Sequence, residues 1–152
     1  MTKEDRVRET RTARIVRVGP DFIETHFKPD AELTPEGIRE NIRARREICQ
    51  GTPHVVLSIF PGEHDLDPSV MRTDLYAGSD GMEAVQALAL VITDDLLPSV
   101  AQLYFTYFPQ TFRTAVFRDE ATARIWLARE LEVLAERQDR PTEGRRDRDT
   151  QE

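Results

Sequence analysis

Residues 84–93 constrain the fold of this chain more than any other stretch. They read AVQALALVIT, and Gln86 is the one polar residue before the final threonine. An apolar run of this length, followed directly by Asp94 and Asp95, is typical of a strand that is buried on both faces of a sheet. We therefore predict a central strand here, with neighbouring strands hydrogen-bonded along both of its edges.

A helix rich in aromatic residues is expected directly after this strand. Its apolar side chains recur at steps of three and four residues, the spacing with which a helix packs on a sheet; they are Leu97, Val100, Ala101, Tyr104, Tyr107 and Phe108. More than one face of the helix carries aromatic side chains, namely Tyr104, Phe105, Tyr107 and Phe108. We expect Phe105 and Tyr104 to lie near the surface, where they would contact a partner protein or line a pocket for an apolar ligand, unless a neighbouring helix covers them.

Turn and capping signals on both sides of this unit divide the chain into alternating strands and helices. They predict a hairpin (13–18 and 22–28), a helix (about 34–50), a strand (54–60), a helix (about 67–78), the central strand and aromatic helix, a last strand (112–117) and a last helix from residue 119 onward. The expected order is β-β-α-β-α-β-α-β-α. A hairpin that leads into such an alternation indicates an α/β fold with a mixed sheet and crossover helices packed on it.

The composition limits the size of the folded part and the class of partner. Residues 1–9 and 136–152 are dense in charge and nearly free of apolar side chains, so we expect disordered tails on either side of a single domain, residues 10–135. The net charge of −7 argues against nucleic-acid binding, which normally needs a basic excess. We find no signal peptide and no apolar run near the roughly 20 residues of a membrane helix, so we expect a cytoplasmic protein without a transmembrane segment.

A family resemblance is carried by residues between Thr34 and Leu127. The segments concerned are the strand 54–60, the region around 77–79, the strand 87–91, the paired aromatics at 104–105 and 107–108, and the closing segment 116–127. In these segments the chain resembles the small bacterial STAS-like (SpoIIAA-like) domains, a class that includes anti-sigma-factor antagonists and is loosely related in shape to the SEC14 lipid-binding fold. The resemblance implies a non-catalytic regulatory or protein-interaction module of the bacterial cytoplasm, which binds a protein partner or forms a homodimer.

The same resemblance implies a candidate phosphoacceptor. Antagonists of this class carry a serine at the start of the helix that follows the strand corresponding to residues 54–60 here, and phosphorylation of this serine switches partner binding. A phosphate there meets the unpaired N–H groups of a helix N-terminus. In this chain proline occupies the acceptor position, within Asp67-Pro68-Ser69, and Ser69 follows one place later. Ser69 is therefore the candidate phosphoacceptor, and a role in capping the turn is the alternative.

Two other functions stay open. The SEC14-like shape implies binding of a small molecule or lipid, which predicts an enclosed pocket lined by residues such as Leu88, Phe105 and Phe108, whereas protein association predicts a flat apolar patch. A metal-dependent hydrolase would need carboxylates that converge at the ends of two buried strands; the candidates are Glu63, His64, Asp65, Asp67, Asp94 and Asp95. Because several of these aspartates are also suited to cap helices, we predict no enzyme activity, no metal and no cofactor.

Overall fold

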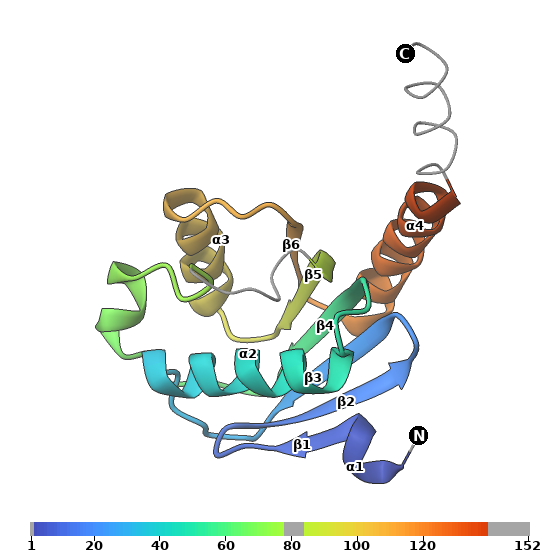
Figure 1. Cartoon of the computed structure of the whole chain (residues 1–152). Helices are drawn as coiled ribbons and strands as arrows, with labels where there is room; N and C mark the ends of the chain where they lie inside the picture. Colours follow the sequence, from blue (N-terminus) through green and yellow to red (C-terminus); the bar gives the residue numbers. More distant parts are fainter. Residues whose placement is uncertain (1, 78–83, 140–152) are drawn as a thin grey trace.

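A six-stranded sheet forms the centre of the molecule in a computed structural model, which describes residues 2–77 and 84–139 (Figure 1). The strands lie side by side in chain order and are β1 (Val7–Glu9), β2 (Ala13–Gly19), β3 (Phe22–Phe27), β4 (His54–Phe60), β5 (Val85–Ile92) and β6 (Arg113–Phe117). The first three strands pair antiparallel, and β3 to β6 pair parallel. The mixed sheet of an α/β fold, with its hairpin at the N-terminal side, confirms the predicted fold class.

β5 is the central strand that the apolar run predicts. It pairs with β4 along one edge and with β6 along the other, and all eight of its residues are buried. Because successive side chains of a strand point to opposite faces, β5 supplies both faces of the sheet with core residues. Leu88, Leu90 and Ile92 pack on one face, and Ala87, Ala89 and Val91 pack on the other.

Helices cover both faces of the sheet (Figure 1). On one face, α2 (Pro35–Cys49) and α3 (Leu97–Tyr107) share a cluster of buried side chains with Leu88 of β5. On the other face, α4 (Glu120–Asp139) packs in a second cluster that includes Leu57 of β4. Side chains from α2, from α3 and from the first face of the sheet therefore meet in one cluster.

The N-terminal residues are not a disordered tail throughout. A short helix, α1 (Lys3–Arg6), precedes β1, and β1 pairs with β2 in a register that places Val7 opposite Val16. The charged side chains of this edge strand have partners on neighbouring elements, since Arg8 lies 3.6 Å from a carboxylate oxygen of Glu47 on α2. The prediction of a tail over residues 1–9 is thus wrong for β1, because an edge strand is held by backbone pairing and needs few apolar residues.

The C-terminal boundary also differs from the prediction. α4 continues to Asp139, so its last turn includes the first residues of the predicted tail, 136–139. Residues 140–152 lie outside the described part of the chain.

The helix predicted for residues 67–78 is a single 3-10 turn. This turn, η1, spans Pro68–Arg72, and Asp67 caps it by accepting a hydrogen bond from the backbone N–H of Ser69 at 2.9 Å. The backbone of Thr73 is extended, and the N–H of Leu75 donates to the hydroxyl of Tyr104 instead of continuing a helix. Local capping signals predicted the start correctly, but a contact with α3 determines the path that follows. Gly78, the predicted end, lies outside the described residues.

Candidate functional site

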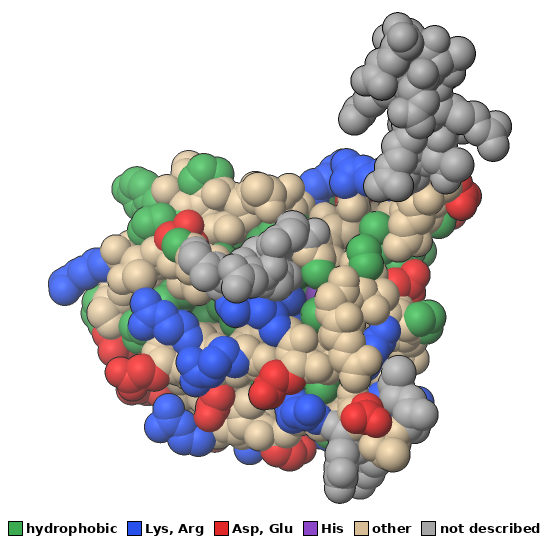
Figure 2. All heavy atoms as spheres, in the orientation of Figure 1, with side chains coloured by type: hydrophobic (Ala, Val, Ile, Leu, Met, Phe, Trp, Pro, Cys, Tyr) green, Lys and Arg blue, Asp and Glu red, His purple; other side chains and the backbone are tan. Residues whose placement is uncertain are grey.

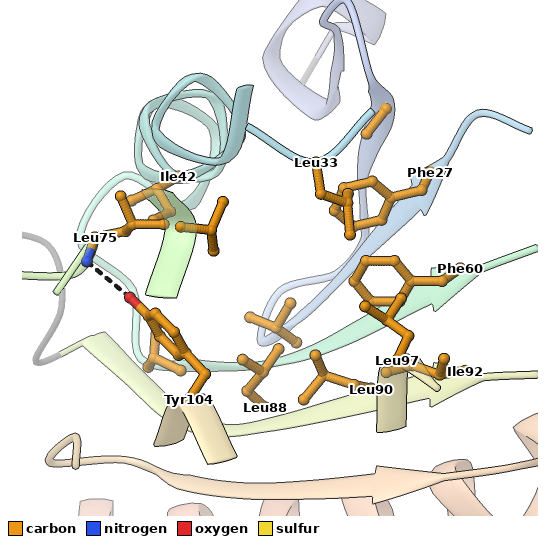
Figure 3. Packing of buried hydrophobic residues seen from close by; sticks show 14 of the residues in the cluster. Phe27, Leu33, Ile42, Phe60, Leu75, Leu88, Leu90, Ile92, Leu97 and Tyr104 are labelled. Carbon is orange, nitrogen blue, oxygen red and sulfur yellow. Dashed lines mark hydrogen bonds between the residues drawn. The ribbon is translucent and has the colours of Figure 1, made fainter. Parts of the chain in front are cut away.

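A cavity of about 120 Å³ lies between the sheet and the helices of its first face. Its walls come from β4, β5, η1 and α3 and are almost entirely apolar; they include Phe60, Val70, Leu88, Leu90, Ala101 and Phe105. Figure 3 shows side chains from α2, β3, β4, β5 and α3 converging on this region. Leu88 and Phe105, two of the three residues named for a ligand pocket, line this cavity, and Phe108 is not among the lining residues.

A second cavity of about 60 Å³ adjoins the first and has a different character. The two cavities share five lining residues, which are Phe27, Ile38, Ser58, Tyr76 and Leu88. The smaller cavity adds Thr25, Asn41 and Arg45, so hydrogen-bonding side chains and a cation gather there. Together the two cavities form a site with a large apolar part and a small polar part.

Arg45 is the charged group of the polar part. It is only 5% exposed, and burial lowers the pKa of its guanidinium from the ordinary value. A nitrogen of this guanidinium lies 3.4 Å from Nε2 of His54, which is also buried. The sequence analysis did not identify Arg45 as a site residue, although the helical spacing from Ile38 through Asn41, Arg45 and Ile48 places it on the inner face of α2.

His54 is held in one orientation at the start of β4. Its Nδ1 lies 2.8 Å from the carbonyl oxygen of Thr52, so Nδ1 carries the proton and donates, and Nε2 accepts from Arg45. Burial, the largest cause, and the nearby positive charges of Arg45 and Arg17 lower the pKa of His54 to about 4, although its hydrogen bond to the carbonyl oxygen of Thr52 opposes the shift. His54 is therefore a neutral acceptor at physiological pH and keeps Arg45 in the site.

Tyr104 fixes the backbone that closes the cavity. Its hydroxyl accepts a hydrogen bond from the N–H of Leu75 and donates one to the carbonyl oxygen of Thr73, each at 2.9 Å (Figure 3 shows the first). Burial raises the pKa of this hydroxyl and raises that of the neighbouring Tyr76 to about 12, so both tyrosines stay neutral. One side chain of α3 thus holds the segment that carries Leu75 and Tyr76 against the cavity.

Replacing Tyr104 with phenylalanine is expected to destabilise the protein by about 1–3 kcal/mol, because the buried N–H of Leu75 and the partly buried carbonyl of Thr73 lose their shared partner. Urea unfolding measures the change in the free energy of unfolding. Tyr107→Phe is the matched control, since this tyrosine is 65% exposed, and it should change the free energy of unfolding by less than about 0.5 kcal/mol. Equal effects of the two changes would contradict the structural role of Tyr104.

The predicted aromatic surface is only partly present. Tyr104 is buried, Phe105 and Phe108 are half-buried, and Tyr107 is exposed. The expected surface position of Tyr104 is therefore wrong, and Tyr107 lies at the surface and not in the stripe that packs on the sheet. The aromatic rings of α3 pack on each other, with the centroids of Tyr104 and Phe105 5.2 Å apart. The outer face of α3 instead exposes Tyr107 together with two leucines, Leu96 and Leu103.

Of the candidate metal ligands, the structure brings Asp94 close to the backbone of His64 but does not gather the set into one site. Asp94 accepts hydrogen bonds from the N–H groups of Leu96 and Leu97 at the start of α3, and these bonds lower the pKa of its carboxyl group. Asp95 is exposed and pairs with Arg118, and the described contact of Asp65 uses its backbone oxygen, which accepts from Leu33. Asp67 is the cap of η1. Within residues 2–77 and 84–139, no three His, Cys, Asp or Glu side chains are placed to hold a metal ion.

Ser69 lies on η1, where its hydroxyl donates to the Asp67 carboxylate at 2.8 Å. Ser69 was expected at the start of an α-helix, but it lies in a five-residue 3-10 turn. A phosphate on Ser69 would lie beside the Asp67 carboxylate. Phosphorylation of Ser69 stays a prediction.

Comparison with known families identifies the domain. The model of a family described as a domain of unknown function, DUF7793, matches residues 21–130. The chain belongs to this family. The DUF7793 region runs from the start of β3 into α4, and it contains every residue that lines the two cavities. A search of curated proteins found no match to this DUF7793 chain.

A solved structure confirms the fold of this DUF7793 protein. It is that of an uncharacterised protein of the DUF3478 family from Shewanella loihica PV-4, described as having a SpoIIAA-like fold. The two chains are 20% identical, the match covers 76% of this chain and 91% of the other, and the TM-score is 0.52. This likeness shows a SpoIIAA-like fold, as the sequence resemblance implied. No helix in the described part of the chain combines the length and the apolar character needed to cross a bilayer.

Proposed function

We propose that this DUF7793 protein is a non-catalytic interaction module of the bacterial cytoplasm, which associates with a second copy of itself through the outer face of α3. The observation that carries the proposal is a group of exposed apolar side chains in a segment that contains no charged residue. Leu96, Leu103 and Tyr107 are 72%, 48% and 65% exposed. Steps of seven and four residues place the three side chains on one side of the helix.

The sequence around α3 is unusual for this chain because it lacks charged residues. Charged residues make up 32% of the chain, yet none occurs between Leu96 and Phe112. Figure 2 shows hydrophobic side chains at the surface over α3, at the upper left of the view. An apolar surface with few charges is the composition found at the centre of protein interfaces.

A second copy is the occupant that fits this surface best. The chain carries a net charge of −7, so most contacts between two copies would bring like charges together. Contact between the α3 helices of two copies avoids this repulsion, because the segment 96–112 contains no charged residue. The neutral polar side chains of Gln102 and Thr106 can form hydrogen bonds at the edge of the contact.

The test is the oligomeric state measured by size exclusion with light scattering. We expect a dimer whose population rises with concentration, and we expect Leu103→Glu to weaken the association at least about a hundredfold, because two facing carboxylates would be buried without partners. Ile125→Glu is the matched control, since Ile125 is an apolar residue of α4 that is 58% exposed and lies outside the proposed interface. A wild-type chain that is monomeric at every concentration would refute the proposal.

A second candidate function is binding of a small molecule, which the two adjoining cavities favour. Leu88 and Phe105 line the larger cavity, as the ligand-binding alternative predicts. This function does not compete with association, because the cavity residues of α3 and the exposed residues of α3 are different side chains.

A further inference from the structure

We propose that the two cavities together bind a small, largely apolar carboxylic acid, with its hydrocarbon part in the larger cavity and its carboxylate in the smaller cavity beside Arg45. The inference rests on the second candidate function and adds the chemical class of the ligand. It follows from the walls, the size and the charge of the site.

The walls of the larger cavity select a hydrocarbon group. The side chains that surround it are aliphatic or aromatic except at the boundary with the smaller cavity, where Ser58 and Tyr76 lie. A polar group placed deeper in this cavity would lose its hydrogen bonds to water without replacement. The volume of about 120 Å³ is close to that of an apolar protein cavity of about 150 Å³ that holds benzene, so one ring or a short chain fits.

The smaller cavity selects a group that accepts hydrogen bonds. Thr25 and Ser58 are direct neighbours in the register of β3 and β4, so their hydroxyl groups lie side by side on the floor of the site. Tyr76 adds a hydroxyl that stays protonated, because burial raises its pKa to about 12. Asn41 is oriented by its hydrogen bonds to Thr10 and Thr12. The hydroxyl groups of Thr25, Ser58 and Tyr76 can each donate a hydrogen bond, which favours an oxygen-rich ligand group.

Arg45 makes a singly charged anion the best match. It is the one cation among the described residues that line the two cavities, and no carboxylate lines them in that part of the chain. Arg45 also contacts other groups of the protein, but its five N–H donors allow it to bind a ligand oxygen in addition. His54 accepts from the guanidinium and keeps it in place, whereas a cationic ligand would meet the positive charge of Arg45.

The experiment compares two probes of nearly equal shape, phenylacetate and the neutral phenylacetamide, by isothermal titration at pH 7 with the full chain. We expect phenylacetate to bind at least about tenfold more tightly, the gain expected from a charge-assisted hydrogen bond over a neutral one. If both probes bind equally, the ligand-binding function holds and the carboxylate assignment fails. If neither probe binds, both fail.

Two variants locate the bound probe. Ala101→Phe places a ring in the larger cavity and should abolish binding of phenylacetate, whereas Ala128→Phe adds the same ring at an exposed position of α4 and should leave binding unchanged. Undiminished binding by Ala101→Phe would overturn the proposal. Arg45→Gln should remove the preference for phenylacetate over phenylacetamide, and the comparison of the two probes on the wild-type chain decides the matter if this variant does not fold.

Discussion

Replacing Leu127 with alanine is expected to lower the free energy of unfolding by about 2–5 kcal/mol, the usual range for removing a leucine from a well-packed core. Leu127 is 0% exposed and packs in the cluster that joins α4 to Leu57 of β4 and Ala89 of β5. Both sheet residues are fully buried and lie on central strands, so the surrounding chain can collapse little around the space left behind.

Urea unfolding measures the loss. Ile125→Ala is the matched control, because Ile125 lies two residues earlier on the same helix and is 58% exposed, and it should change the free energy of unfolding by less than about 0.5 kcal/mol. A loss of similar size for both variants would show that α4 does not pack on the sheet through Leu127.

The second large effect is a loss of stability on mild acidification, which His54 causes. The pKa of His54 is about 4 in the folded protein, against 6.5 for an ordinary histidine. At a pH between these two values, His54 binds a proton in the unfolded chain but not in the folded protein. The contribution of neutral His54 is therefore complete above pH 6.5 and is lost as the pH falls from 6.5 towards 4, by a total of about 3 kcal/mol.

The measurement is urea unfolding of the wild-type chain and of His54→Asn at several pH values between 7.5 and 4.5. Asparagine retains a donor near the carbonyl oxygen of Thr52 but does not titrate. We expect the variant to be less stable at pH 7.5 and to show a flatter pH dependence, whereas His26→Asn, at a more exposed histidine, should keep the wild-type fall. An unchanged slope in His54→Asn would exclude His54 as the cause.

β5 could be predicted from the sequence and the orientation of α3 could not, for different physical reasons. β5 is buried on both faces, so every position requires an apolar residue, and the pattern needs no knowledge of its neighbours. α3 is apolar on more than one side, and spacing alone does not decide which side meets the sheet. The hydroxyl of Tyr104 decides it, because its partners lie about thirty residues earlier, at Thr73 and Leu75.

The polar part of the candidate site was missed for a related reason. Charged residues on a helix are normally solvent-exposed, so the sequence analysis did not place Arg45 in the site. Its burial depends on His54, which belongs to the next strand, and on a cavity formed by β3, β4 and β5. Glu24 is likewise a charged residue, yet it is buried between His26 and Arg124, which lies one hundred residues later.

Sequence patterns alone predict the alternation of strands and helices, the central position of β5 and the start of α2 at Thr34, whose hydroxyl accepts from the N–H of Gly37. These features depend on residues close together in the chain, so their signals are local. Contacts between distant segments place Tyr107 on the outer side of α3, Arg45 beside a cavity and residues 7–9 in the sheet. Burial is a property of contacts between segments far apart in sequence, and no local pattern contains it.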